Sequence, residues 1–201
     1  MKLYYSPGAC SLSPHIVAEE AGIPLELEKV DLQSHKTEHG QDFYAVNPKG
    51  YVPALQLDDG AVLSEGPVIV QYLADLKPES RLAPANGTLE RYKLQEWLSF
   101  INSEIHKSFS PLFRDSPDEF KKDAIAKIGK RMAYVNEQLA GKHYLLGETF
   151  TVADAYMFVM LTWANHLKLD MGAYSNLHAY FARIAGRPKV HAAMKAEGLV
   201  K

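Results

Sequence analysis

The chain has 201 residues, of which 47% are hydrophobic and 23% charged, so it is long enough to bury one large core or two smaller ones. Its formal net charge of −2 gives no electrostatic reason to expect nucleic acid or an anionic membrane as a partner. A single cysteine excludes an intramolecular disulfide framework and suits a reducing cytoplasm.

No segment indicates export or a membrane. The first residues, MKLYYSPGA, reach a Pro-Gly pair before any apolar run could form the core of a signal peptide. The longest apolar segment, residues 155–167, is too short to span a bilayer and carries polar residues, which favours a buried helix. We therefore expect a cytoplasmic protein.

The first eighty residues mix strand and helix patterns. A short strand is expected at Lys2–Tyr5, then a turn at Pro7-Gly8, a helix over Ser11–Ala21 that Gly22 ends, and an alternating strand over Leu25–Leu32. A polar loop over residues 33–40 and a short helical piece before Asn47 follow.

Two apolar runs then flank Asp59-Gly60, which is the strongest short-range hairpin signal. The segment Ser64–Pro67 opens a helix that ends by Lys77-Pro78. The resulting order, βαβαββα, is compatible with a thioredoxin-like α/β domain over residues 1–80.

The composition changes after this point. Residues 77–88, KPESRLAPANGT, are typical of a linker, and no strand alternation follows it. We expect an all-helical C-terminal domain over residues 87–201, with main helices at Arg91–Phe109, Asp118–Leu139, Val152–Lys168, Asn176–Ile184 and Val190–Glu197. Thr151 and Asp154 resemble a capping box ahead of the third of these.

The single cysteine, Cys10, lies between a strand-to-helix turn and a helix start. The positive end of the helix dipole favours a thiolate there and lowers the pKa of the thiol. Redox sites of the thioredoxin type have C-x-x-C at this place, whereas here the second position is Ser13, so an internal dithiol cycle is impossible. An inert, packed cysteine is the alternative.

Two further segments of the first domain suggest binding of a peptide-like molecule. A cis bond at Val52-Pro53 would let the Val52 backbone pair with an extended peptide, although an ordinary edge-strand proline explains the pattern as well. Glu65 and Gly66 at a helix start suit the ammonium and carboxylate of an amino-acid end; a carboxylate that only stabilises its own helix is the alternative.

In the helical half, one narrow stripe is rich in small hydroxyl residues. At 100° per residue it holds Ser99, Ser103, His106 and Ser110, while Leu94, Leu98, Ile101 and Ile105 lie opposite. A ligand or a packed neighbouring domain would explain this stripe equally well. The motif His35-x-x-Glu38-His39 matches a zinc-peptidase pattern but lies in a short loop, so we expect no metal site.

Six segments together resemble the cytosolic glutathione transferases, and most closely the bacterial beta class. They are MKLYYSPGACSLSPHI, VNPKGYVPALQLDDG, LSEGPVIVQYLAD, EWLSFINSEIHKSFSPLF, FTVADAYMF and RIAGRPKVHAAMKAEG. The resemblance covers essentially the whole chain. It implies a thioredoxin-like N-terminal domain, an all-α C-terminal domain and a homodimer, with glutathione as a cosubstrate and no tightly bound cofactor.

The resemblance also implies roles for single residues in the first domain. Cys10 would lie beside the glutathione sulfur and could form a mixed disulfide with it. Val52, ahead of a cis Pro53, would hold the cysteinyl backbone, and Glu65 with Gly66 would hold the γ-glutamyl end.

Other roles follow by the same resemblance. Ser103 and His106 would line the far side near the sulfur, Glu104 would reach the neighbouring subunit's site, and Tyr5 would have a supporting role. His35 stands where close relatives carry lysine, so its contact to the glycyl carboxylate is expected to be weaker and pH-dependent. Ser99 replaces an asparagine, which bears on substrate preference.

We therefore expect a glutathione S-transferase that conjugates glutathione to electrophilic, hydrophobic small molecules. Two alternatives remain at this stage: a glutathione-dependent monothiol thiol-disulfide oxidoreductase, and a non-catalytic protein that binds hydrophobic ligands.

Overall fold

The computed structural model describes residues Met1–Lys201 and divides into two compact units. The first comprises Met1–Ala83 together with Gly186–Lys201, and the second comprises Pro84–Ala185. The division at Ala83 falls within the expected linker. The last helix groups with the first unit, whereas the sequence pattern assigns it to the helical half, because an amphipathic helix does not reveal which surface it covers.

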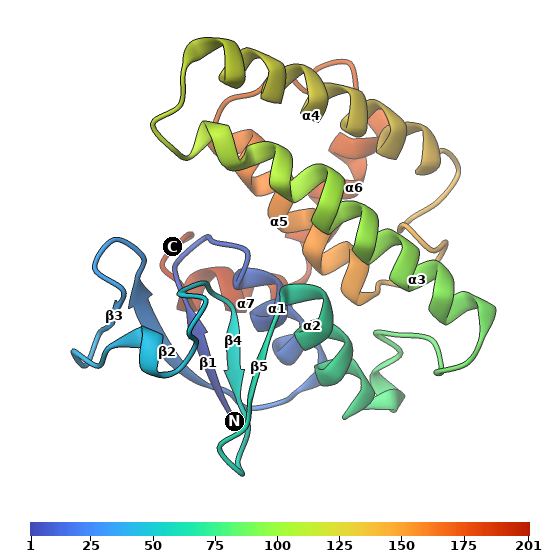
Figure 1. Cartoon of the computed structure of the whole chain (residues 1–201). Helices are drawn as coiled ribbons and strands as arrows, with labels where there is room; N and C mark the ends of the chain where they lie inside the picture. Colours follow the sequence, from blue (N-terminus) through green and yellow to red (C-terminus); the bar gives the residue numbers. More distant parts are fainter. The chain divides into compact units, whose positions relative to one another are not determined.

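The first unit is built on a five-stranded mixed sheet (Figure 1) with the order β3-β2-β1-β4-β5. Strands β1 and β2 pair in parallel, and the other neighbours pair antiparallel. The strands are β1 (Lys2–Tyr5), β2 (Glu26–Asp31), β3 (Lys36–Thr37), β4 (Ala54–Gln56) and β5 (Val62–Ser64). The expected thioredoxin-like arrangement is confirmed, with one additional strand: β3 lies in the predicted polar loop and is too short to show alternation.

Three helices complete the first unit: α1 (Leu12–Ala21), α2 (Gly66–Asp75) and α7 (Pro188–Ala196). Gly22 ends α1 in the left-handed conformation, with φ of 67°, as a glycine at this position does most readily. The short helical piece before Asn47 is a 3-10 turn, Phe43–Ala45, and a second such turn, Pro78–Ser80, follows α2. Helix α7 packs beside α1 (Figure 1), which explains why it belongs to this unit.

The second unit is entirely helical. It contains α3 (Leu89–Phe100), α4 (Asp118–Gln138), α5 (Val152–His166) and α6 (Ser175–Ala185), and α5 packs against both α3 and α6. The capping box of Thr151 and Asp154 is present at the start of α5. Helix α3 continues without a break into a π-helical turn, Ile101–Ile105, and then a 3-10 helix, His106–Leu112, so the predicted first helix is not a uniform α-helix.

No helix in the chain combines the length and the apolar character needed to cross a membrane.

A buried carboxylate ties the end of the chain to the turn before Cys10. Glu197 is 6% exposed and accepts a hydrogen bond from the Gly8 N–H, at 2.9 Å. Its other oxygen lies 2.9 Å from Nδ1 of His15 in α1, which is also buried. The side chain of Leu199 covers Gly8 closely. The C-terminal segment therefore holds both the turn and the first helix.

We expect Glu197→Ala to destabilise the protein by about 3 kcal/mol, because it removes a buried acceptor that bonds both the Gly8 N–H and the buried imidazole of His15. Glu19→Ala is the matched control: Glu19 joins the same two helices through an exposed ion pair to Lys189, at 3.5 Å, and its loss should cost less than about 1 kcal/mol. Urea unfolding followed by circular dichroism measures both. Equal losses in the two variants would contradict the role given to Glu197.

Candidate functional site

Cys10 lies in the turn that leads from β1 into α1, two residues before the helix begins. The turn is closed by backbone bonds from Ala9 N–H to the Ser6 carbonyl and from Leu12 N–H to the Ala9 carbonyl, both 3.0 Å. Ser13 donates its hydroxyl to the Cys10 carbonyl at 3.1 Å. The sulfur thus sits at the positive end of the α1 dipole, which favours an anion.

The Cys10 thiol donates to the Val52 carbonyl oxygen, with 3.3 Å between Sγ and O. The Val52-Pro53 peptide bond is cis, as the resemblance implies. A Cβ added to Gly66 would lie 3.9 Å from the Pro53 ring, so the start of α2 approaches this segment closely. The predicted residues Cys10, Val52, Pro53 and Gly66 are therefore neighbours in the first unit.

Glu65 precedes α2 with φ of 72°, an unusual conformation for a residue with a side chain. Its backbone carbonyl accepts from the N–H groups of Val68 and Ile69, and its half-exposed carboxylate pairs with Lys49 at 2.8 Å. Lys49 also donates to the Ser64 hydroxyl at 3.1 Å. Sequence reasoning missed Lys49, since an exposed loop lysine carries no signal of its partner.

His35 also has a left-handed backbone, with φ of 52°, and its ring lies against that of Tyr44 in a tilted arrangement, with centroids 4.6 Å apart. Its Nδ1 is buried and has no hydrogen-bond partner. A Cβ at Gly50 would meet the Tyr44 ring at 2.6 Å, so this arrangement requires glycine there. A buried, unpartnered nitrogen is best left without a proton, which places the imidazole proton on Nε2.

Tyr5 is 9% exposed, and its ring lies 6.4 Å from that of His15. Burial, and then the charge of Glu197, raise the pKa of Tyr5, which works against its ionisation.

In the second unit, the predicted apolar face opposite the hydroxyl-rich stripe is confirmed, because its residues are all buried: Leu94, Leu98, Ile101 and Ile105. Opposite them, Ser99 and Ser103 are exposed and joined by a bond from the Ser103 hydroxyl to the Ser99 carbonyl, at 2.9 Å. Glu104 pairs with Arg131 of α4, with 2.6 Å between the closest atoms, so this carboxylate already has a partner in its own chain.

His106 follows the π-helical turn. Its Nδ1 lies 2.6 Å from the hydroxyl of Tyr156 in α5, and that hydroxyl donates to Oδ1 of Asn102 at 3.0 Å. The ring meets Trp163 edge-on with 4.9 Å between centroids. Sequence reasoning missed Tyr156 and Asn102; the signal available was a tyrosine in an apolar helix, whose hydroxyl needs a partner.

A groove of about 520 Å³ lies on the second unit, where residues of α3, of α4 and of the loop that follows α4 line it. It is lined by apolar and aromatic side chains with charged residues at its edge, including Leu89, Trp97, Phe100, Tyr134, Lys93 and Lys142.

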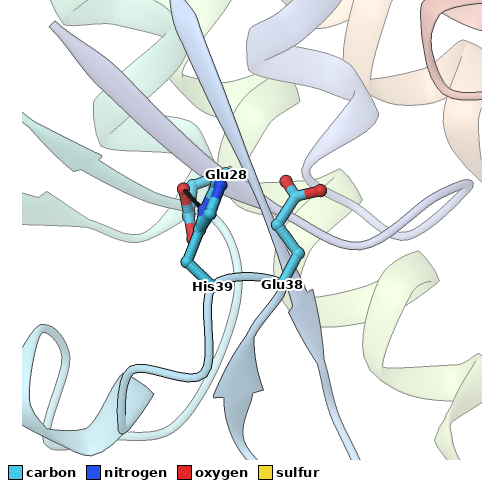
Figure 2. A group of neighbouring side chains, drawn as sticks. All are labelled: Glu28, Glu38 and His39. Carbon is cyan, nitrogen blue, oxygen red and sulfur yellow. Dashed lines mark hydrogen bonds and ion pairs between the residues drawn. The ribbon is translucent and has the colours of Figure 1, made fainter.

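The zinc-like motif is divided by the fold. His35 packs against Tyr44, whereas Glu38 and His39 lie near Glu28 of β2, with their ligand atoms within 4.8 Å of one another (Figure 2). His39 Nδ1 bonds both oxygens of Glu28, at 2.8 and 2.9 Å, and Glu38 accepts the Lys29 N–H at 2.8 Å. His39 and Glu28 thus serve as hydrogen-bond partners for each other, and Glu38 bonds the backbone of β2.

The pairing shifts both protonation equilibria. The hydrogen bond and charge of Glu28 raise the pKa of His39. Burial alone would raise the pKa of Glu28, but hydrogen bonds from His39 and Thr37 outweigh it and leave that pKa lowered. The charged pair is therefore favoured at pH values above the lowered pKa of Glu28 and below the raised pKa of His39.

The family described as glutathione S-transferase, N-terminal domain, matches residues 8–76, and the one described as glutathione S-transferase, C-terminal domain, matches residues 100–188. The chain is 48% identical over 200 residues to glutathione S-transferase GstA of Escherichia coli O157:H7, covering 99% of this chain and 100% of that protein.

Solved structures of other glutathione S-transferases are also similar to this chain. The ternary complex of BphK, a bacterial glutathione S-transferase, has a TM-score of 0.98 at 56% identity, over 99% of this chain and 100% of that one. A sphingomonad glutathione S-transferase complexed with glutathione has a TM-score of 0.96 at 51% identity, with 100% of both chains covered. A beta-class enzyme of Sphingomonas chungbukensis has a TM-score of 0.97 at 53% identity, again with 100% of both chains covered.

The His39–Glu28 pair predicts a pH-dependent stability. The contribution of His39 is complete below its unfolded-state pKa of about 6.5 and is lost as the pH rises through its raised folded-state pKa. His39→Gln should therefore be less stable than the wild type at pH 6, and the two should converge by pH 9. Urea unfolding at both values measures this, with His191→Gln, an exposed histidine on α7, as the control. A difference that stays constant with pH would contradict the pairing.

Proposed function

This chain belongs to the glutathione S-transferase family, and from that premise we propose how its residues divide the work of conjugating glutathione to electrophilic, hydrophobic small molecules. The proposal is carried by the close grouping of Cys10, the Val52 carbonyl and Pro53 with Gly66, beside the starts of two helices. This grouping offers backbone acceptors, helix-end donors and a thiol to one extended, anionic peptide.

In this proposal, residues 1–80 hold glutathione and residues 87–201 supply the electrophile side. The enzyme acts in the cytoplasm as a homodimer, which the family resemblance supports and for which exposed apolar residues such as Leu89, Tyr92 and Phe120 provide surface. Glu104 is assigned a contact with glutathione in the neighbouring subunit, for which it would exchange Arg131 as its partner.

Each part of glutathione meets a complementary group. The N–H of its cysteinyl residue donates to the Val52 carbonyl, and the γ-glutamyl ammonium binds Glu65 while the adjacent carboxylate accepts from Gly66 at the start of α2. The Lys49–Glu65 pair keeps Glu65 in place until the ammonium arrives. The glycyl carboxylate accepts from His35, whose Nε2–H is set by the buried Nδ1.

The chemistry belongs to the glutathione sulfur. His106 takes the thiol proton, and the α1 dipole and Cys10 stabilise the resulting thiolate. The thiolate attacks the electrophilic carbon, a C–S bond forms, and the leaving group departs with its electron pair. Ser99, Ser103 and Tyr5 line the site without exchanging protons; the raised pKa of Tyr5 agrees with a neutral phenol there.

One observation favours a second candidate function. Cys10 is in no disulfide and Ser13 stands at the resolving position, so Cys10 could attack a glutathione mixed disulfide and be released only by a second glutathione. This is the monothiol form of thiol-disulfide exchange.

Cys10→Ala separates the two candidates. We expect conjugation of an activated aryl halide to persist with a kcat reduced by no more than about tenfold, because the attacking sulfur is that of glutathione. Reduction of a mixed glutathione disulfide should fall to the uncatalysed rate, since its attacking thiolate is gone. Wild-type conjugation at the uncatalysed rate, with disulfide reduction intact, would overturn the transferase assignment.

Glu65→Gln tests the γ-glutamyl contact. Removing the charge that meets the ammonium should raise the KM for glutathione about tenfold and leave kcat nearly unchanged, because Glu65 contacts the γ-glutamyl group and not the reacting sulfur of the cysteinyl residue. The matched control is Glu79→Gln, an exposed glutamate that also pairs with a lysine of the first unit, at 3.8 Å. A KM change shared by both variants would argue against a specific contact.

A further inference from the structure

A buried tyrosine in the second unit contacts His106. Tyr156 lies in α5 among apolar neighbours and is 1% exposed. A phenolic hydroxyl removed from water needs hydrogen-bond partners. Here the hydroxyl donates to Oδ1 of Asn102, at 3.0 Å, and lies 2.6 Å from Nδ1 of His106.

Counting protons decides the direction of the second bond. The phenol has one proton, and the Oδ1 atom of Asn102 can only accept, so the hydrogen bond between them uses that proton. The bond to His106 therefore needs the imidazole proton on Nδ1, with the phenol oxygen as acceptor. In a neutral imidazole, a proton on Nδ1 leaves the lone pair on Nε2.

We propose that Tyr156 and Asn102 are positioning residues that hold His106 as the Nδ1–H tautomer, with Nε2 as the proton acceptor. The ring orientation is fixed as well, because Nδ1 is bonded to a side chain of a buried helix and Trp163 stands edge-on to the ring at 4.9 Å. Asn102 and His106 both come from the irregular end of the α3 segment, whereas Tyr156 comes from α5.

The consequence for the reaction rests on the proposed function. When the S–H bond of glutathione breaks, its proton forms an N–H bond at Nε2, leaving a thiolate and an imidazolium. The Nδ1–H of that imidazolium remains bonded to the Tyr156 oxygen, which stabilises the added charge. After attack on the electrophile, a C–S bond forms and the leaving group departs with its electron pair, and the imidazolium releases the proton from Nε2 to solvent.

The tautomer can be measured without any assay of activity. Nitrogen-15 NMR of histidine-labelled protein, at a pH where His106 is neutral, should place the proton on Nδ1 in the wild type. Asn102→Asp keeps an acceptor that cannot donate and should preserve this pattern. Asn102→Ala releases the phenol proton, which should turn toward Nδ1 and move the imidazole proton to Nε2. A wild-type proton on Nε2, or an Asn102→Ala pattern equal to the wild type, would overturn the proposal.

Kinetics supply a second readout. Tyr156→Phe should lower kcat for conjugation about tenfold, with the KM for glutathione changed less than about twofold, because only the positioned base is affected. Tyr180→Phe is the control, since it also removes a buried hydroxyl, one that bonds Asp154 at 2.9 Å, without contacting His106. Equal losses of kcat in both variants would make Tyr156 merely structural. Absence of conjugation in the wild type would defeat the proposed function and leave the NMR test of the tautomer in force.

Discussion

The candidate site of the first unit depends on the backbone of one residue, Val52. Its side chain is 7% exposed and packs in the core with Tyr4, Phe43, Val30 and Ala54. Its carbonyl oxygen accepts the Cys10 thiol, and the ring of the next residue lies against the start of α2. The side chain of Val52 is thus fixed by close packing, which holds its main-chain N–H and carbonyl groups in a defined position. Recognition through such groups requires no particular side chain, only a rigid backbone.

Buried carboxylates supply rigidity where the chain has no regular structure. Glu197 joins the turn before Cys10 to α7. In the second unit, Asp154 accepts hydrogen bonds from the Leu145 and Thr151 backbone and from the Tyr180 hydroxyl, all within 2.9 Å. Burial raises the pKa of Asp154 more than these bonds lower it. Each carboxylate ties loop backbone to a helix, close to Cys10 in the first unit and close to Tyr156 in the second. Removing either carboxylate would take the acceptor away from several donors at once.

Local patterns predicted most of the fold and the parts of the site that depend on a turn. A short apolar run before a Pro-Gly turn located β1, and alternation located β2. Asp59-Gly60 located the β4–β5 hairpin, and the turn chemistry around Cys10 and Glu65 placed each beside a helix start. What local patterns could not provide is pairing between distant segments. Lys49 meets Glu65 across 16 positions and His106 meets Tyr156 across 50, and neither partner carries a mark of the other. The same limit applies to α7, whose apolar face predicts burial but not against α1.

Irregular backbone marks the site more directly than residue type does. Four residues other than glycine have positive φ, and two of them, His35 and Glu65, are predicted glutathione contacts. Such conformations cost on the order of 1–3 kcal/mol and persist only where the surroundings enforce them. The π-helical turn at Ile101–Ile105 is a second case, since such turns are rare and occur frequently at functional sites. A helical wheel at 100° per residue ignores this turn. It therefore identifies the buried face correctly but does not reveal that Asn102 and His106 share the hydroxyl of Tyr156. Because Asn102 and His106 both bond the hydroxyl of Tyr156, the irregular segment and the imidazole are tied to the same atom of α5.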